Sequence, residues 1–338
     1  MNGDLMNSKD RVSLTTKSTA VEESWAQMCA GIGAVLWAGV AVLARIGFAP
    51  IGAIELMFLF APLVIVPLGM ELGRVAGSDT PLARFALRVQ PVAAALALVA
   101  LWLPPGRSAG GLACAWMLVC LAMTATAIVD LSSLWRLHAD TSLGSTASRV
   151  TVAVAQFDLA VGGAWFMASR FGMRPMGVQE PISLLTAVHF HYAGFSTAMI
   201  AAAMLRFAEQ RRERRWLKWL VAVVLGMPFV VAAGFVISPL LKMGAGIVFS
   251  ASVAGMAVVL GSCTKKLESV TARVLFHVAS ASVFAGMVLS SAYAVADFRG
   301  SDVLPIPQMA RTHGVLNAVG FCLPALLGWL VENASTSQ

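Results

Sequence analysis

The chain has 338 residues, of which 58% are hydrophobic and only 12% are charged. In an ordinary soluble domain about a quarter of the residues are charged, so this composition excludes that class. The net charge of +7 does not point to nucleic acid, because the basic residues stand in short segments between long apolar runs, as they do in membrane proteins.

Apolar runs long enough to cross a bilayer follow one another along the chain. A hydrocarbon core about 30 Å thick requires about 20 residues of helix. We expect ten such helices, at 28–48, 51–70, 89–103, 111–134, 150–168, 182–205, 217–238, 241–261, 273–296 and 312–331. The predicted fold is all-α, a polytopic membrane helix bundle. A single transmembrane domain at 28–332 is expected between a polar N-terminal tail at 1–27 and a short C-terminal tail at 333–338.

The basic residues are divided unequally between the two sides of this expected bundle. If the N-terminus lies in the cytoplasm, most of the 24 Lys and Arg residues fall in cytoplasmic segments. Since cytoplasmic loops carry an excess of Lys and Arg, we predict that both termini are cytoplasmic. The tail at 1–27 lacks the pattern of a cleaved signal peptide, so we expect the first span to act as an uncleaved signal.

Polar residues within the spans begin with Glu55 and Asp158. Glu55 stands near the outer end of the second expected span, and Asp158 stands near the middle of the fifth. Because an ionised side chain is costly in the hydrocarbon core, such residues usually have a partner or a function. We expect Asp158 to pair with a basic group or to act as an acid in a dry pocket, with Trp165 on the pocket wall. Glu55 is expected to bind a substrate or to lie in water at the end of its helix.

The sixth expected span carries the most unusual motif, His189-Phe190-His191-Tyr192-Ala193-Gly194-Phe195. Two imidazoles and a phenol within a bilayer are rarely present without a role. Residues two apart on a regular helix point about 200° apart, so His189 and His191 face opposite directions. We therefore expect one imidazole to face a polar cavity and the other to bond a neighbouring helix.

The start of the tenth expected span also carries polar side chains, from Arg311 to Asn317. His313 and Asn317 are four residues apart and share one helix face. The alternating directions of the spans place them in the same outer half of the bilayer as His189, so we predict one chamber of protonatable side chains there. The candidate catalytic residues are Asp158, His189, His191 and His313. The candidate substrate-binding residues are Tyr192, Arg311, Asn317, Glu55, Trp165 and Phe195.

We expect neither a metal site nor a cofactor. None of the cysteines belongs to a Cys-x-x-Cys pair, which argues against a zinc site or a disulfide framework. The spacing of His189 and His191 differs from the four-residue spacing of helical zinc ligands. Haem ligation by His189 and His313 stays open as an alternative.

Three blocks of the sequence resemble the YndJ-like family of bacterial integral membrane proteins. They are His189 to Phe195, Arg311 to Phe321 and Asp158 to Trp165, within a resemblance that covers about residues 30–330. The resemblance implies a multi-pass protein of the bacterial inner (cytoplasmic) membrane, and it implies architecture more than activity. Some members carry an extra soluble C-terminal domain, which we do not expect in a chain that ends at Gln338.

Three functions agree with this pattern. The first is an intramembrane isomerase or cyclase that acts by acid/base chemistry, without a cofactor, on a lipid-soluble isoprenoid or polyketide-like substrate. The second is a proton-coupled or small-molecule transporter, although polar groups in the outer half fit a midplane transport site poorly. The third is a binding or assembly protein without turnover. The expected partners are the lipid bilayer and a hydrophobic small molecule, and no protein partner is indicated.

Overall fold

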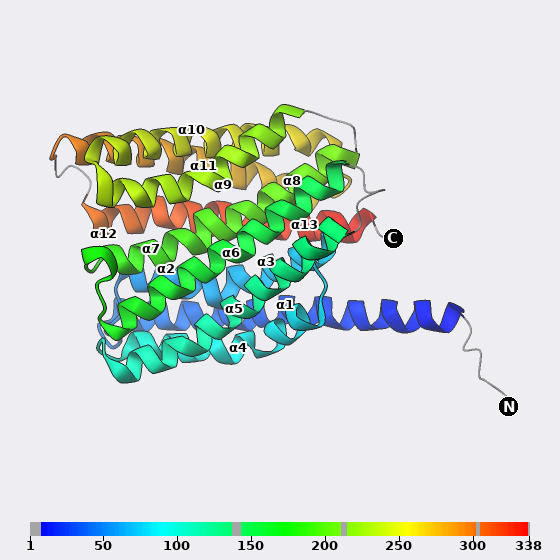
Figure 1. Cartoon of the computed structure of the whole chain (residues 1–338), viewed down its shortest axis with the longest axis horizontal. Helices are drawn as coiled ribbons and strands as arrows, with labels where there is room; N and C mark the ends of the chain where they lie inside the picture. Colours follow the sequence, from blue (N-terminus) through cyan, green and yellow to red (C-terminus); the bar gives the residue numbers. More distant parts are fainter. Residues whose placement is uncertain (1–7, 137–142, 211–214, 302–304, 337–338) are drawn as a thin grey trace.

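A computed structural model describes residues 8–136, 143–210, 215–301 and 305–336 (Figure 1). Within these ranges the regular structure is helical and contains no strand. The α-helices are α1 (Ser8–Arg45), α2 (Ala53–Phe60), α3 (Val66–Val75), α4 (Pro81–Trp102), α5 (Arg107–Arg136), α6 (Leu143–Phe171), α7 (Ile182–His189), α8 (Thr197–Gln210), α9 (Arg215–Ile237), α10 (Pro239–Cys263), α11 (Val270–Phe298), α12 (Ile306–Met309) and α13 (Leu323–Thr336).

Short segments of other helix types join several of these helices. Those with π-helical geometry are η1 (Ala61–Ile65), η3 (Phe190–Ser196), η5 (Ala310–Gly314) and η6 (Leu316–Cys322). Those with 3₁₀ geometry are η2 (Pro175–Gly177) and η4 (Thr264–Lys266). As a result, α2–η1–α3 and α7–η3–α8 each form one continuous rod.

Nine helices in the described ranges are long and apolar enough to cross a membrane. They are Trp25–Arg45, Ala53–Val75, Pro81–Trp102, Arg107–Leu134, Thr146–Phe171, Trp216–Ile237, Pro239–Lys266, Val270–Phe298 and Ile306–Thr336. The rod from Ile182 to Gln210 packs along α6 as a tenth, and its two histidines and tyrosine lower its mean hydropathy. The prediction of an all-α polytopic membrane bundle is confirmed.

The rods run side by side in one bundle (Figure 1). The helices α9, α10 and α11 form one edge, α4 and α5 form the opposite edge, and α6 with α7–α8 lies between them. The start of α1 and the end of α13 lie at the same end of the bundle, which we call the terminal end. The connections α1–α2, α4–α5, α6–α7, α9–α10 and α11–α12 lie at the other end, which we call the loop end.

The first helix contacts the second rod at a glycine. A Cβ atom placed on Gly33 would lie 2.0 Å from the carbonyl oxygen of Leu63 and 2.7 Å from its carbonyl carbon. Small residues permit such close backbone approach between membrane helices, where van der Waals packing drives association. Since the obstacle at Gly33 is backbone in η1, no side-chain rotation would relieve it.

Gly33→Ala is therefore expected to destabilise the protein by about 1–3 kcal/mol, the usual cost of overpacking. Gly31→Ala on the same helix is the matched control, because a Cβ at Gly31 would meet nothing within 4 Å. The free energy of unfolding in detergent micelles measures both changes. Equal effects of the two substitutions would show that the Gly33 contact does not limit packing.

Candidate functional site

A cavity of about 250 Å³ lies between α2, the α7–η3 rod, α9, α10, α11 and the helix that begins with α12 and η5. Most of the side chains that line it are apolar. Its polar lining includes His189, Tyr192, His313 and Asn317. The cavity therefore joins residues from the sixth and tenth expected spans, which are far apart in sequence.

His189 is the last residue of α7, and its side chain lines the cavity. The ring Nδ1 lies 2.7 Å from the carbonyl oxygen of Leu185, one turn earlier. Because a carbonyl only accepts, Nδ1 carries the hydrogen and donates it. Within the described ranges Nε2 has no hydrogen-bond partner. The ring is exposed although it lies inside the bundle, since its free surface faces the cavity.

His313 is held in the same manner from the opposite wall. Its Nδ1 lies 2.8 Å from the carbonyl oxygen of Gly286 on α11, so Nδ1 again donates. Asn317 donates from Nδ2 to the carbonyl oxygen of His313 at 2.6 Å. His189 and His313 both line the cavity. The two imidazoles thus share one cavity, and the described residues leave the Nε2 atom of each without a partner.

Tyr192 and Asn317 stand at fixed positions beside these rings. The Tyr192 hydroxyl donates to the carbonyl oxygen of Met57 at 2.7 Å and so ties η3 to α2. Asn317 packs against Gly286, where a Cβ would lie 2.9 Å from Nδ2. Both side chains line the cavity and have little freedom to turn away.

His191 faces away from the cavity and belongs to the packed core. Its Nε2 accepts a hydrogen bond from Trp116 Nε1 on α5 at 2.9 Å, and its Nδ1 donates to the carbonyl oxygen of Ala187 at 2.8 Å. The ring also lies edge-on to Phe58, with centroids 5.1 Å apart. The i, i+2 spacing predicted this division, with one histidine on a cavity and the other bonded to a neighbouring helix. The cavity was expected to be polar, but most of the side chains that line it are apolar.

Breaking the Trp116–His191 bond is expected to lower stability. Trp116→Phe leaves a buried ring nitrogen without its donor, and an unsatisfied buried polar atom costs about 1–3 kcal/mol. Adding His191→Phe makes both partners apolar, so the double variant should recover part of the loss. Free energies of unfolding for the wild type, both single variants and the double variant give the coupling energy. Strictly additive losses would contradict a direct bond.

Asp158 is fully buried in α6 and does not line the cavity. In the described part of the chain neither of its carboxylate oxygens has a hydrogen-bond partner. It packs against Gly194 of η3, where a Cβ would lie 3.0 Å from Oδ2. Because Tyr192 and Ala193 of the same segment do line the cavity, the η3 backbone stands between Asp158 and the two cavity histidines.

The other predicted binding residues lie outside the cavity lining. Glu55 Oε2 accepts the backbone N–H of Gly52 at 3.1 Å and caps α2. Phe195 fills the space beside Gly69, where a Cβ would lie 2.6 Å from the ring. Trp165 packs on the hydrophobic core, and Arg311 is exposed. Of the six residues predicted to bind a substrate, Tyr192 and Asn317 face the cavity.

Some residues that line the cavity are absent from the predicted catalytic and substrate-binding sets. Lys242, Ser290, Tyr293 and Asp297 all line the cavity near the loop end. A signal was available on α11, where Ser290, Tyr293 and Asp297 recur every three or four residues. No pattern in the chain indicated the π-helical turns, which are often found at functional sites.

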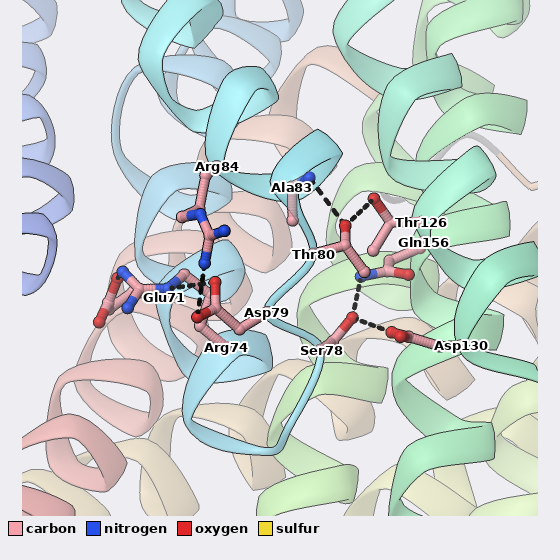
Figure 2. A network of polar contacts seen from close by, with 10 residues as sticks. All are labelled: Glu71, Arg74, Ser78, Asp79, Thr80, Ala83, Arg84, Thr126, Asp130 and Gln156. Carbon is pink, nitrogen blue, oxygen red and sulfur yellow. Dashed lines mark hydrogen bonds and ion pairs between the residues drawn. The ribbon is translucent and has the colours of Figure 1, made fainter. Parts of the chain in front are cut away.

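At the terminal end, the loop between α3 and α4 holds a network of ion pairs (Figure 2). Asp79 binds Arg74, with Nε and Oδ1 3.4 Å apart, and Arg84, with Nη1 and Oδ2 3.2 Å apart. Arg74 Nη1 also lies 3.2 Å from Glu71 Oε2. The loop is thereby fastened to both helices that it connects.

The same loop is fastened to α5 and α6 on its other side (Figure 2). The Ser78 hydroxyl donates to Asp130 and accepts from Gln156 Nε2 at 3.2 Å. Thr80 caps α4 by accepting the N–H of Ala83 at 3.0 Å. Neither Glu71 nor Asp130 lines the cavity, so these acidic residues belong to the packing of the terminal end.

Candidate metal ligands do not cluster in the described ranges. No group of three or more His, Cys, Asp or Glu side chains there is arranged to hold a metal ion. The five cysteines, Cys29, Cys114, Cys120, Cys263 and Cys322, form no disulfide with one another.

Comparison with known proteins identifies the family. The family described as YndJ-like protein matches residues 56–321, which include nearly the whole cavity lining. The uncharacterized membrane protein YndJ of Bacillus subtilis (strain 168) is 34% identical over 176 residues, which are 52% of this chain and 32% of that protein. The match therefore spans about a third of the relative. No solved structure matches. The chain is a multi-pass membrane protein and belongs to the YndJ-like family.

Proposed function

We propose that the protein is an intramembrane isomerase or cyclase that acts, without a cofactor, on a lipid-soluble isoprenoid or polyketide-like molecule. One observation carries the proposal: His189 and His313 line the same largely apolar cavity, each with Nδ1 bound to a backbone carbonyl. Imidazole exchanges protons readily near neutral pH and is the most common acid/base group in enzymes.

The chemistry follows from the two free Nε2 atoms. The imidazole that is protonated gives its Nε2 proton to one end of a carbon–carbon double bond, which leaves a cation at the other end. The second imidazole then removes a proton from the next carbon beyond that cation. The double bond shifts, the substrate keeps its composition, and the two rings exchange protonation states. The same first step, followed by attack of an internal double bond on the cation and loss of a proton, closes a ring.

The cavity walls favour a particular ligand. A cavity of about 150 Å³ binds benzene, so about 250 Å³ accepts a somewhat larger apolar molecule or one end of a longer chain. The Tyr192 hydroxyl donates to Met57, so its oxygen is left to accept. We therefore expect the ligand to carry a hydroxyl group that donates a hydrogen bond to the Tyr192 oxygen. His191 and Asp158 take no part in the proposed reaction.

Proton-coupled transport is the second candidate, and Asp158 is the residue that favours it. A buried carboxyl without a bonding partner among the described residues is typical of proton relays in membranes. A transport path would have to continue to the terminal end, where Glu71 and Asp130 are held in the polar network. We therefore rank transport below the enzyme.

We place the protein in a bacterial inner membrane with both termini in the cytoplasm. The relative in Bacillus subtilis is named a membrane protein, and the excess of Lys and Arg falls on the terminal side. In this orientation the loop end faces the outside of the cell.

The test is to incubate membranes containing the protein with short isoprenoid alcohols and ketones in D₂O. Acid/base isomerisation should introduce deuterium into the ligand at the carbons that gain a proton, and mass spectrometry detects it. Membranes that contain the His189→Gln, His313→Gln double variant are the control. A ligand that binds in the cavity yet leaves with its mass and structure unchanged would argue for transport or binding alone.

A further inference from the structure

One wall of the cavity, on α11, carries a row of polar groups. Gly286, Ser290, Tyr293 and Asp297 are four, three and four residues apart, so they share one helix face. Ser290, Tyr293 and Asp297 line the cavity, and the carbonyl oxygen of Gly286 accepts from His313. At 1.5 Å per residue, the row runs about 16 Å along α11, from His313 to the loop end. We call these four residues the α11 row.

The outer end of the α11 row is charged and partly exposed. Lys242 Nζ of α10 lies 2.6 Å from Asp297 Oδ2, and the two side chains are 24% and 29% exposed. Lys242 also lies over the Phe235 ring, 4.8 Å from its centroid. The polar groups of this wall therefore lead from solution toward the histidines.

The hydroxyl groups of the α11 row are suited to hold water. In the described ranges, neither the Ser290 nor the Tyr293 hydroxyl has a protein partner. Water enters a protein cavity where about two to four polar groups bind it, and it stays out of purely apolar cavities. The two hydroxyl groups and the Nε2 atoms of His189 and His313 are polar groups of this kind on a single cavity surface.

At the terminal end the helices around the cavity are tied together. Arg206 of α8 binds the carbonyl oxygen of Val75 on α3, and its Nη2 lies 2.7 Å from Asn333 Oδ1 on α13. Glu332 of α13 accepts the backbone N–H groups of Glu268 and Ser269 before α11, at 2.9 and 3.1 Å. These bonds tie α3, α8, α11 and α13 together at the terminal end, so we take the loop end as the side of access.

We infer that the α11 row forms a hydrated path by which His189 and His313 exchange protons with the solution at the loop end. The inference rests on the proposed function, since it supplies the protons that the acid/base reaction uses. Tyr293 and Ser290 act as positioning residues that hold water, and Lys242 with Asp297 keeps the mouth hydrated.

Cysteine accessibility tests the path in the absence of any substrate. In the full chain with its five native cysteines replaced by alanine, Ser290→Cys places a thiol of nearly equal size on the α11 row. Val288→Cys is the control, because Val288 is 57% exposed, does not line the cavity, and faces lipid on the same helix. Thiols react as thiolates, which require water. A membrane-impermeant methanethiosulfonate should modify Ser290→Cys at least about tenfold faster than Val288→Cys.

Vesicles prepared in each of the two orientations show from which side of the membrane the reagent reaches the thiol. Modification of Ser290→Cys from the loop side supports the path, and modification from the terminal side alone overturns it. Equal rates at positions 290 and 288 also overturn it. Ala294→Cys, one turn further along the lining, repeats the test if Ser290→Cys fails to assemble. The enzyme proposal can fail while the hydrated path stands, because ligand turnover can be absent while the thiol stays accessible.

Tyr293→Phe tests the relay rather than the opening. Loss of the hydroxyl should slow deuterium incorporation into the ligand at least about tenfold while ligand affinity stays within about twofold. An unchanged rate of incorporation would remove Tyr293 from the path. A loss of affinity equal to the loss of rate would assign it to ligand binding instead.

Discussion

Replacing His313 by glutamine is expected to lower the turnover of a bound ligand by about two to four orders of magnitude, the usual contribution of a positioned acid or base. Glutamine has a similar length and can bond the Gly286 carbonyl oxygen, but it cannot exchange a proton at neutral pH. Ligand affinity is expected to change little. His189→Gln should have the same effect, because either loss removes one half of the proton exchange. Deuterium incorporation measures turnover, and equilibrium binding measures affinity.

His277→Gln is the matched control for these variants. His277 is also on α11, but it is exposed and does not line the cavity. We expect the ligand turnover of the His277→Gln variant to stay within a few-fold of that of the wild type. Residues that act as a unit give non-additive losses, so the double variant should be only slightly worse than either single one. Full activity in either His189→Gln or His313→Gln would remove that residue from the reaction.

Replacing Arg74 by methionine is expected to destabilise the protein by about 3–5 kcal/mol, the cost of breaking a buried ion pair by removing one partner. The side chains of Arg74 and Glu71 are 6% and 1% exposed, and Arg74 also binds Asp79 in the loop between α3 and α4 (Figure 2). Removal of the guanidinium weakens the pairing of two acidic groups at once. The free energy of unfolding in bicelles measures the loss.

Arg84→Met is the matched control for Arg74→Met. Arg84 binds the same Asp79 carboxylate at 3.2 Å, but its side chain is 36% exposed. A solvated pair of this kind contributes about 0–1 kcal/mol. Adding Glu71→Gln to Arg74→Met should recover part of the stability, because the buried charge that Arg74 neutralised is then absent. Similar losses for Arg74→Met and Arg84→Met would mean that burial does not set the strength of the pairs.

The membrane fold could be predicted because lipid restricts the backbone severely. Every N–H and C=O group in the bilayer must bond within the protein, so apolar runs of this length form helices. The runs in this sequence predicted ten helices, and nine described helices meet the length and hydropathy of a span while the rod around His189 lies among them. The polar residues of that rod lower its mean hydropathy, so it does not meet the hydropathy of a span. The same residues indicate a site.

The candidate site could be predicted only in part. Helical spacing separated His189 from His191 and joined His313 to Asn317, because residues on one helix have known relative directions. Spacing along one helix carries no information on which helix packs opposite. Asp158 was therefore placed with the histidines, although η3 lies between them and Gly194 takes the contact. Glu55 was read as a site residue, although its carboxylate caps its own helix.

By itself the sequence determined that the protein is a multi-pass helical bundle and that His189, Tyr192, His313 and Asn317 were residues to examine. Both conclusions rest on local chemistry, namely the cost of polar groups in lipid and the period of a helix. The tertiary structure alone decided which of these side chains share a cavity and that Asp158 is buried without lining it. Those facts depend on contacts between helices distant in sequence, which no single helix encodes.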